Sequence, residues 1–393
     1  MRSVGREPLF VTSGSGAEIE DVDGNRYVDY VCSWGPLILG HAHPVVVEAV
    51  IRAAERGTSY GAPTEAEVEL ATEVVERVPS AEMVRLVSSG TEASMTAVRL
   101  ARAVTGRDKI VKFAGHYHGH VDGLLAESGS GLATQGIPAS PGVTKAQAAD
   151  TIVVPWNDQR ALASAVDDGV AAILAEPLPA NMGLVPASDD FLQMMAECAT
   201  ATGALLIFDE VITGFRVARG GFQERLVGQP DLTILGKVLG GGLPLAAVAG
   251  RRDLMEQLAP IGATYQAGTL SGNPLATAAG LATLGQLDDA AYSRLREITH
   301  RLAHGLRGEK VQVTSETGLL TVFFSERPVT DYTSAQAADR DAFAAFWTAM
   351  LERGIYLPPS PFEAWFPSLA HSDEHVEQTL EAAAESFAIV RAG

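Results

Sequence analysis

The sequence has very few cysteines, since Cys32 and Cys198 are the only two in 393 residues. Two thiols cannot form a disulfide framework or a cysteine zinc site, and such chains are typical of reducing compartments. No apolar run approaches the roughly 18 residues that span a bilayer, and Met1 to Phe10 carries charges and a proline in place of an apolar signal core. We therefore expect a cytoplasmic protein with no membrane partner.

Positive charge is also scarce. Lysine and arginine total 29 against 48 aspartate and glutamate residues, which gives a formal net charge of -19 at pH 7. Because this charge repels phosphate backbones and anionic lipids, we expect no nucleic-acid partner. With 47% hydrophobic and 20% charged residues, the composition is that of a folded globular protein, and intrinsic disorder is excluded.

Short apolar runs alternate with helix-length segments, which predicts an α/β fold. Strands are expected at 83–87, 109–113, 151–154, 171–176, 204–209, 232–235, 245–249 and 318–324, and helices at 45–56, 66–78, 341–353 and 373–391. Apolar strands separated by helices are typical of a mostly parallel sheet with helices on both faces. We expect a strand-rich N-terminal segment (1–44) with a β-hairpin around Asp23-Gly24-Asn25, a large domain (45–285) and a small C-terminal α+β domain (286–393).

Two carboxylates, Asp209 and Glu210, end the apolar strand that begins at Ala204. The carboxyl end of a parallel strand lies at the sheet edge where α/β proteins bind ligands. A structural interpretation, in which one carboxylate only caps the following turn, fits this stretch equally well.

A second apolar strand, 232–235, brings Lys237 next to a glycine cluster. Burial lowers the pKa of a lysine, so its free amine can attack a carbonyl and form a Schiff base. A P-loop fails because most of the glycines follow the lysine and Val238 stands at the Ser/Thr position. The structural alternative is a surface lysine whose apolar stem is buried. Together, Lys237 and Asp209 match pyridoxal phosphate, which needs an imine-forming amine and a carboxylate beside its pyridine nitrogen.

Small polar residues at Ser88 to Glu92 follow the strand 83–87 and open a helix. Free backbone N–H groups at a helix N-terminus bind phosphate. Taken alone, the stretch is more typical of a plain N-cap, but the Asp209 and Lys237 pair favours a phosphate site.

Three alternating histidines, His116, His118 and His120, follow the strand 109–113. Zinc is the weaker interpretation, because no nearby cysteine or acidic ligand completes a set and a glycine interrupts the strand geometry. An aromatic platform, in which Tyr117 stacks on a flat cofactor, is favoured. We expect no metal.

These motifs stand in the order typical of class III, fold type I pyridoxal-phosphate enzymes, which the chain resembles over nearly its whole length. The resemblance is carried by 89–92, 117–120, 209–211, 235–237 and 265–274. The segments 33–44, 57–63, 181–183, 213–216 and 368–371 are more narrowly similar to the glutamate-1-semialdehyde 2,1-aminomutase subgroup.

The resemblance implies a role for each matching position. Lys237 would hold pyridoxal 5'-phosphate covalently, and Asp209 would pair with its pyridine nitrogen. The other implied cofactor contacts are Gly90 and Thr91 at the phosphate, Tyr117 and Val211 on the two ring faces, His118, Asn181 beside the hydroxyl, and Thr269 at the phosphate of the neighbouring subunit in a homodimer. Trp34, Ser130 and Glu363 would line the substrate pocket, and the loop 129–138 would gate it.

The implied reaction is intramolecular amino transfer. It would start from pyridoxamine 5'-phosphate and convert glutamate-1-semialdehyde into 5-aminolevulinate, a tetrapyrrole precursor. The alternatives are a class III aminotransferase on an ω- or β-amino compound, a non-enzymatic binding protein with this fold, and a metalloenzyme. The joint presence of Lys237 and Asp209 argues against a binding protein.

Three positions depart from the subgroup pattern. The chain begins at Met1-Arg2-Ser3, where the family has a further segment that contacts the substrate carboxylate. Trp365 stands where a glycine is usual and places a bulky ring next to Glu363, so that trimming it should improve substrate handling if the ring narrows the pocket. The stretch 317–320 also lacks the usual small-Met-aromatic pattern. All three departures concern the substrate, whereas the implied cofactor site is complete.

Overall fold

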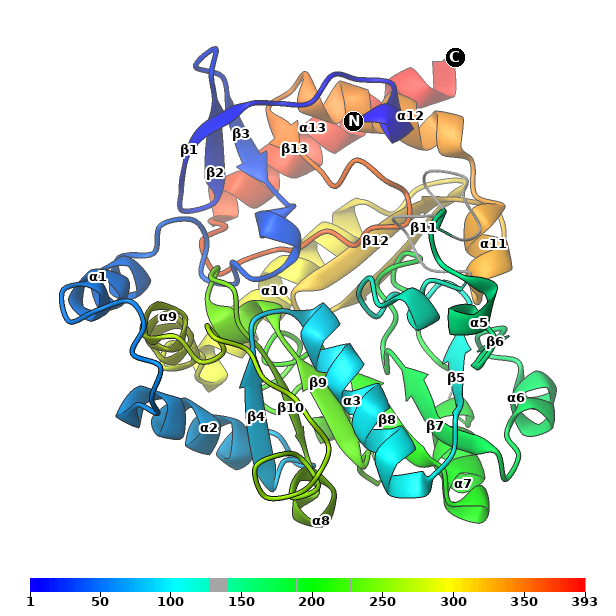
Figure 1. Cartoon of the computed structure of the whole chain (residues 1–393). Helices are drawn as coiled ribbons and strands as arrows, with labels where there is room; N and C mark the ends of the chain where they lie inside the picture. The colour runs from blue at the N-terminus through cyan, green and yellow to red at the C-terminus, as the bar shows by residue number, and fades with distance from the viewer. Residues whose placement is uncertain (127–139, 189, 227, 393) are drawn as a thin grey trace.

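A seven-stranded sheet forms the centre of the computed structural model, which describes residues 1–126, 140–188, 190–226 and 228–392 (Figure 1). Its strand order is β4-β10-β9-β8-β7-β5-β6. The strands are β4 (Met83–Val87), β5 (Lys109–Phe113), β6 (Thr151–Val154), β7 (Val170–Ala175), β8 (Leu205–Asp209), β9 (Leu232–Leu235) and β10 (Ala246–Gly250). Strands β5 to β9 pair in parallel, whereas β10 is antiparallel to β4 and β9. The predicted mostly parallel sheet is confirmed, and the strand ends differ from the predicted ones by at most one residue.

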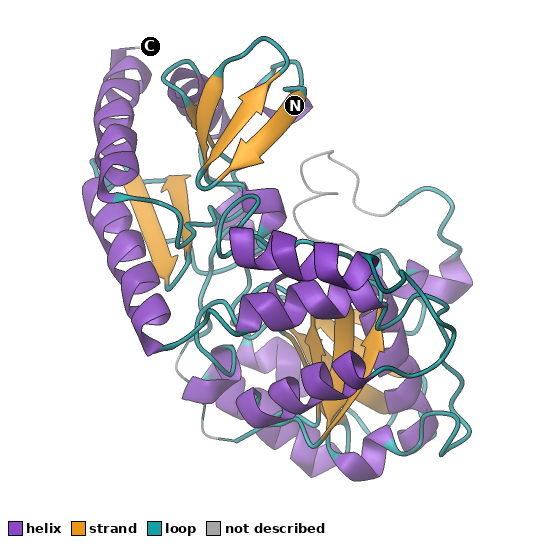
Figure 2. Cartoon of the chain, turned by 90° about the vertical axis from the view of Figure 1, so that its left-hand side faces the viewer, coloured by secondary structure: helices purple, strands orange, loops and turns teal. Residues whose placement is uncertain are grey.

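Helices cover both faces of this sheet (Figure 2). Helix α3 (Gly90–Thr105) packs on β7, β9 and β10, whereas α7 (Phe191–Thr202) packs on β7 and β8. Successive side chains of a strand point to opposite faces, so Leu174 of β7 joins the core under α3 and Ile173 joins the core under α7. Burial on both faces explains why the central strands read as continuous apolar runs.

A four-stranded sheet joins the two ends of the chain. It has the order β1-β2-β3-β13 and consists of β1 (Val11–Ser15), β2 (Glu18–Asp21), β3 (Arg26–Asp29) and β13 (Ile355–Tyr356). The predicted N-terminal hairpin is the antiparallel pair β2 and β3, and β13 adds to β3 in parallel. In Figure 1 the blue strands β1 to β3 lie beside the red helix α13 (Asp373–Ala392).

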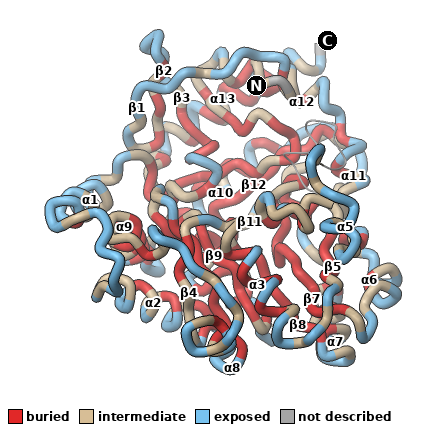
Figure 3. The backbone as a smooth tube through the Cα atoms, viewed as in Figure 1, coloured by how far each residue is buried: buried red, intermediate tan, exposed pale blue. Residues whose placement is uncertain are grey.

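A separate antiparallel hairpin, β11 (Val311–Glu316) and β12 (Leu319–Phe324), lies between the two sheets (Figure 1). It packs against α10 (Asp289–Gly305), and β12 also contacts α12 (Arg340–Leu351). One apolar core combines residues from both ends of the chain, with β12 and α12 contributing beside Tyr30 and Trp365. Figure 3 shows this buried interior next to the one around the large sheet.

The remaining elements lie around these sheets. The helices are α1 (Pro44–Ala54), α2 (Glu65–Arg77), α5 (Lys145–Ala148), α6 (Gln159–Ala165), α8 (Arg252–Met255), α9 (Pro274–Leu284) and α11 (Tyr332–Gln336). The 3-10 turns are η1 (Arg2–Val4), η2 (Cys32–Trp34), η3 (Asp122–Leu124), η4 (Phe222–Arg225) and η5 (Lys237–Gly240). Within the described ranges, no helix combines the length and the apolar character that a membrane crossing requires.

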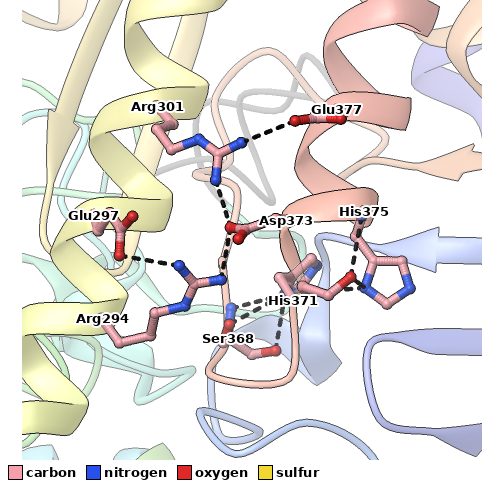
Figure 4. Close-up of polar contacts among 9 residues, drawn as sticks. Arg294, Glu297, Arg301, Ser368, His371, Asp373, His375 and Glu377 are labelled. Carbon is pink, nitrogen blue, oxygen red and sulfur yellow. Dashed lines mark hydrogen bonds and ion pairs between the residues drawn. The ribbon is translucent and has the colours of Figure 1, made fainter.

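Ion pairs connect α10 to the start of α13 (Figure 4). Asp373 accepts from Arg294 at 2.9 Å and also pairs with Arg301, which lies 3.6 Å from Glu377. Exposed pairs of this kind contribute little to stability, because water screens the charges. They orient two helices whose association depends mainly on the apolar core.

Candidate active site

A cavity of about 370 Å³ opens at the carboxyl ends of β5, β7, β8 and β9 and at the N-terminus of α3. This is the sheet edge where the strand-end carboxylate and lysine were predicted to meet. Eight of the residues singled out in the sequence line it: Gly90, Thr91, Tyr117, His118, Asn181, Asp209, Val211 and Lys237.

The N-terminus of α3 forms one wall of the cavity. Ser89 is the N-cap, and its hydroxyl accepts from the Glu92 N–H at 3.2 Å. The N–H groups of Gly90 and Thr91, which come next, have no partner within the helix and would donate to an anion bound at this helix end. The loop that carries Gly119 packs closely on this helix end, because a Cβ on Gly119 would lie 2.5 Å from the Thr91 hydroxyl, whereas a Cβ on Gly90 would make only a tight contact of 3.3 Å with Val211. This wall therefore fits a phosphate group.

Asp209 ends β8 and is 6% exposed. Its carboxylate accepts from the Val211 N–H at 3.0 Å and from Nδ1 of the buried His118 at 2.8 Å. Burial raises the pKa of Asp209 to about 7, against the lowering effects of the Val211 N–H and of Lys237. A cationic ring nitrogen beside this carboxylate would favour its ionised form. Burial keeps the pKa of His118 well below its usual value, so the ring is neutral. Its Nδ1 can then donate a hydrogen bond to the ionised Asp209 carboxylate.

Lys237 follows β9 as the first residue of η5 and has a left-handed φ of 47°. A non-glycine residue in this region costs about 1–3 kcal/mol, and such strain is typical of active sites. Burial lowers the pKa of Lys237, while the charges of Asp209, Glu363 and Glu176 act in the opposite direction. A Cβ on Gly35 would lie 3.2 Å from the Lys237 side chain, so this glycine leaves room for the amine.

Glu176 is a site residue that the sequence reasoning missed. It follows β7, is 3% exposed and lines the cavity. Its carboxylate accepts from the Tyr117 N–H at 2.8 Å, the Ala180 N–H at 3.0 Å and the Asn181 amide at 2.9 Å. The signal was present, because the predicted strand 171–176 runs into this carboxylate just as the strand before Asp209 does.

The three histidines bind different partners. Nδ1 of His116 accepts from the Glu176 N–H at 3.0 Å, His118 contacts Asp209, and Nδ1 of His120 lies 3.1 Å from the Thr91 hydroxyl. In the part of the chain that the structure describes, no group of three or more His, Cys, Asp or Glu side chains is placed to hold a metal ion.

Comparisons with known proteins agree with this geometry. Residues 1–386 match the model of the family described as aminotransferase class III. The chain belongs to the class III aminotransferase family. It is 54% identical to a glutamate-1-semialdehyde 2,1-aminomutase of Desulforudis audaxviator, over 100% of this chain and 93% of that protein.

Solved structures of class III relatives have the same fold. An omega-transaminase from Sphaerobacter thermophilus superimposes with a TM-score of 0.92 at 36% identity, covering 100% of this chain and 94% of that one. A glutamate-1-semialdehyde-aminomutase from Pseudomonas aeruginosa PAO1, in complex with PMP, gives 0.87 at 28% identity, covering 98% and 88%. The predicted fold type I architecture is thereby confirmed.

Three predicted positions within the described ranges do not line this cavity. Thr269 lies exposed in the turn before α9, and Trp34 is 42% exposed in η2. Glu363 is half-buried, and its charge contributes to raising the pKa of Lys237 and that of Tyr117. Ser130, like the expected gate at 129–138, lies outside the described residues.

The ring of Trp365 does not narrow the pocket. Its side chain is 1% exposed and joins the apolar core shared by both ends of the chain, with its ring centroid 5.6 Å from that of Tyr30. The backbone of Trp365 pairs with Leu320 of β12, which directs the ring into that core instead of the cavity.

Proposed function

We propose that the chain converts glutamate-1-semialdehyde into 5-aminolevulinate by intramolecular amino transfer. The observation that carries the proposal is the meeting of Lys237 and Asp209 in one cavity with the N-terminus of α3. The 54% identity to an aminomutase over the whole chain supports the choice of substrate. Enzymes of this kind supply tetrapyrrole synthesis.

Pyridoxal 5'-phosphate, which alternates with pyridoxamine 5'-phosphate, is the cofactor of this reaction, and the cavity residues fit it. The first-turn N–H groups at Gly90 and Thr91 would hold its phosphate, and Asp209 its pyridine nitrogen. We assign the remaining contacts to the residues that line the same cavity: Tyr117 and Val211 at the ring faces, and Asn181 at the hydroxyl. When bound, the cofactor supplies an electron-accepting ring that weakens the bonds at the amino-bearing carbon.

The protein groups supply binding and proton transfer. Burial lowers the pKa of Lys237, so a larger fraction of Nζ is unprotonated and can accept a proton from a bound substrate. Asp209 keeps its acceptor oxygens fixed by the Val211 N–H and by His118. A substrate carbon bound next to Lys237 would therefore have Nζ as a base on one side, while Asp209 would keep the pyridine nitrogen of the cofactor protonated.

The test is to incubate the pyridoxamine form with glutamate-1-semialdehyde and measure 5-aminolevulinate with and without an added keto acid. We expect product without the keto acid, and none from a Lys237→Ala variant. The structural likeness to an omega-transaminase makes an aminotransferase the second candidate. It would be supported if the semialdehyde gave no product while another amine converted the cofactor and a keto acid restored it.

We also propose a cytoplasmic homodimer in which Thr269 reaches the phosphate site of the neighbouring chain. In support, Thr269 is exposed and does not line the cavity of its own chain. Tyr265 and Leu270 of the same loop are 72% and 54% exposed, so the loop presents large side chains that a neighbouring chain would cover in a dimer. The negative net charge of the chain supports a small-molecule substrate with no nucleic-acid or membrane partner.

Mixing two inactive variants tests this arrangement. A dimer of Thr269→Ala and Lys237→Ala chains would contain one site with an intact lysine and an intact neighbouring threonine. We expect the mixture to regain activity that neither variant has alone. An active monomer in light scattering, or no gain on mixing, would contradict the proposal.

A further inference from the structure

Two walls of the cavity are joined by one buried carboxylate. Tyr117 belongs to the loop after β5, whereas Asn181 belongs to the loop after β7. Both lie within hydrogen-bond distance of Glu176, Tyr117 through its backbone N–H to Oε1 and Asn181 through its side-chain amide to Oε2. The carboxylate is therefore the link between a residue assigned to the ring face and one assigned to the cofactor hydroxyl.

Three donors bind this carboxylate within the described residues. The Tyr117 N–H, the Ala180 N–H and the Asn181 amide donate to it, so an ionised, acceptor-only carboxylate suits the site. Burial, and then the charge of Asp209, raise the pKa of Glu176 to about 7. The three donors work against this effect and favour the ionised form.

The donor pattern also fixes the orientation of the Asn181 amide. Because the ionised Glu176 carboxylate only accepts, it favours the orientation in which the NH2 group of Asn181 faces it, as in this structure. The carbonyl oxygen of the amide is then the atom that is left to accept a hydrogen bond from a ligand hydroxyl in the cavity. A residue at 176 that donated toward Asn181 would favour the flipped amide.

We propose that Glu176 is a positioning residue of the cofactor pocket, which fixes the Tyr117 backbone and the orientation of the Asn181 amide. The backbone N–H of Glu176 strengthens the link, because it donates to Nδ1 of His116, next to Tyr117. The proposal rests on the cofactor part of the proposed function and is independent of the substrate.

The test uses full-length protein freed of cofactor, titrated with pyridoxal 5'-phosphate while absorbance and visible circular dichroism are recorded. In E176Q either orientation of the new amide sets an NH2 group against an N–H donor. One buried donor is then unpaired, and we expect about tenfold to a hundredfold weaker binding with a changed dichroic band. Because Glu176 acts partly through Asn181, the E176Q/N181A double variant should lose less than the product of the two single losses.

Glu210→Gln is the matched control. Glu210 is also a fully buried carboxylate at a strand end, and it accepts from Thr213, Phe222 and Gln223, but it does not line the cavity. We expect E210Q to lower stability and to leave the dissociation constant and the dichroic band unchanged.

Three outcomes would overturn the proposal: wild-type binding by E176Q, equal effects of E176Q and E210Q, or fully additive effects of E176Q and N181A. If E176Q does not fold, E176D and N181A replace it, and unchanged binding by both would overturn the proposal. Failure of the proposed function is distinguishable, because wild-type protein would then bind the cofactor without forming 5-aminolevulinate. Wild-type protein that binds no cofactor would overturn both.

Discussion

Replacing Trp365 tests where its ring lies. The side chain is 1% exposed and packs in the core that joins both ends of the chain. Truncating a buried tryptophan to alanine costs about 3–5 kcal/mol, because transfer energy is lost and a cavity remains. A glycine at the same position adds about 0.5–1 kcal/mol through backbone entropy. Since whole proteins are stable by about 5–15 kcal/mol, Trp365→Gly should remove a large share of the total.

Denaturation by urea, followed by fluorescence and by cofactor release, measures this loss. Trp365→Phe is the graded control and should lose less, because most of the ring volume stays. Cofactor affinity of the folded fraction should be unchanged in both variants, since the ring does not line the cavity. If Trp365→Gly kept wild-type stability and turned over glutamate-1-semialdehyde faster, the ring would lie in the pocket and the structural argument would be refuted.

Three further predictions concern the site and its support. Asp209→Asn should still bind the cofactor but lose activity by orders of magnitude, because the ring nitrogen loses its anionic partner; near-normal turnover would remove the assigned role. In the cofactor-free protein, the raised pKa values of Asp209 and Glu176 mean that the folded state binds more protons than the unfolded state between about pH 4 and about pH 7. The contribution of the two carboxyl groups to stability should therefore fall as the pH rises through this range. In urea titrations, the free energy of unfolding should depend less on pH for Asp209→Asn than for the wild type. Arg216→Met should destabilise the chain, because the buried guanidinium donates to the carbonyls of Gly318 and Pro367 at 3.1 Å each; unchanged stability would show that these contacts contribute nothing.

The large sheet and the centre of the site were predictable from local patterns. A strand buried on both faces reads as an apolar run, and the first polar residue after it marks the ligand edge. That rule found Asp209 and Lys237. It applies equally to Glu176, which was missed because its partners, the Tyr117 N–H and the Asn181 amide, come together only in the folded chain.

The remaining differences depend on contacts between distant segments. An apolar run carries no direction, so the antiparallel course of β10 was not predicted. Strand β11 was not predicted, because it is only partly buried and its polar residues interrupt the apolar run that marked the other strands. The place of Trp365 is set by pairing with Leu320, which no local pattern contains, and the role proposed for Thr269 involves a second chain.

The central claim is that Lys237 is the attachment point of the cofactor, and peptide mapping tests it directly. The chain has only five lysines, and Lys112 is a second buried one, whose Nζ donates to the Leu124 carbonyl at 2.9 Å. After borohydride reduction of the loaded protein, mass spectrometry should find the pyridoxyl group on the peptide that contains Lys237. A pyridoxyl group on Lys112 or another lysine, or none on any peptide, would contradict the account.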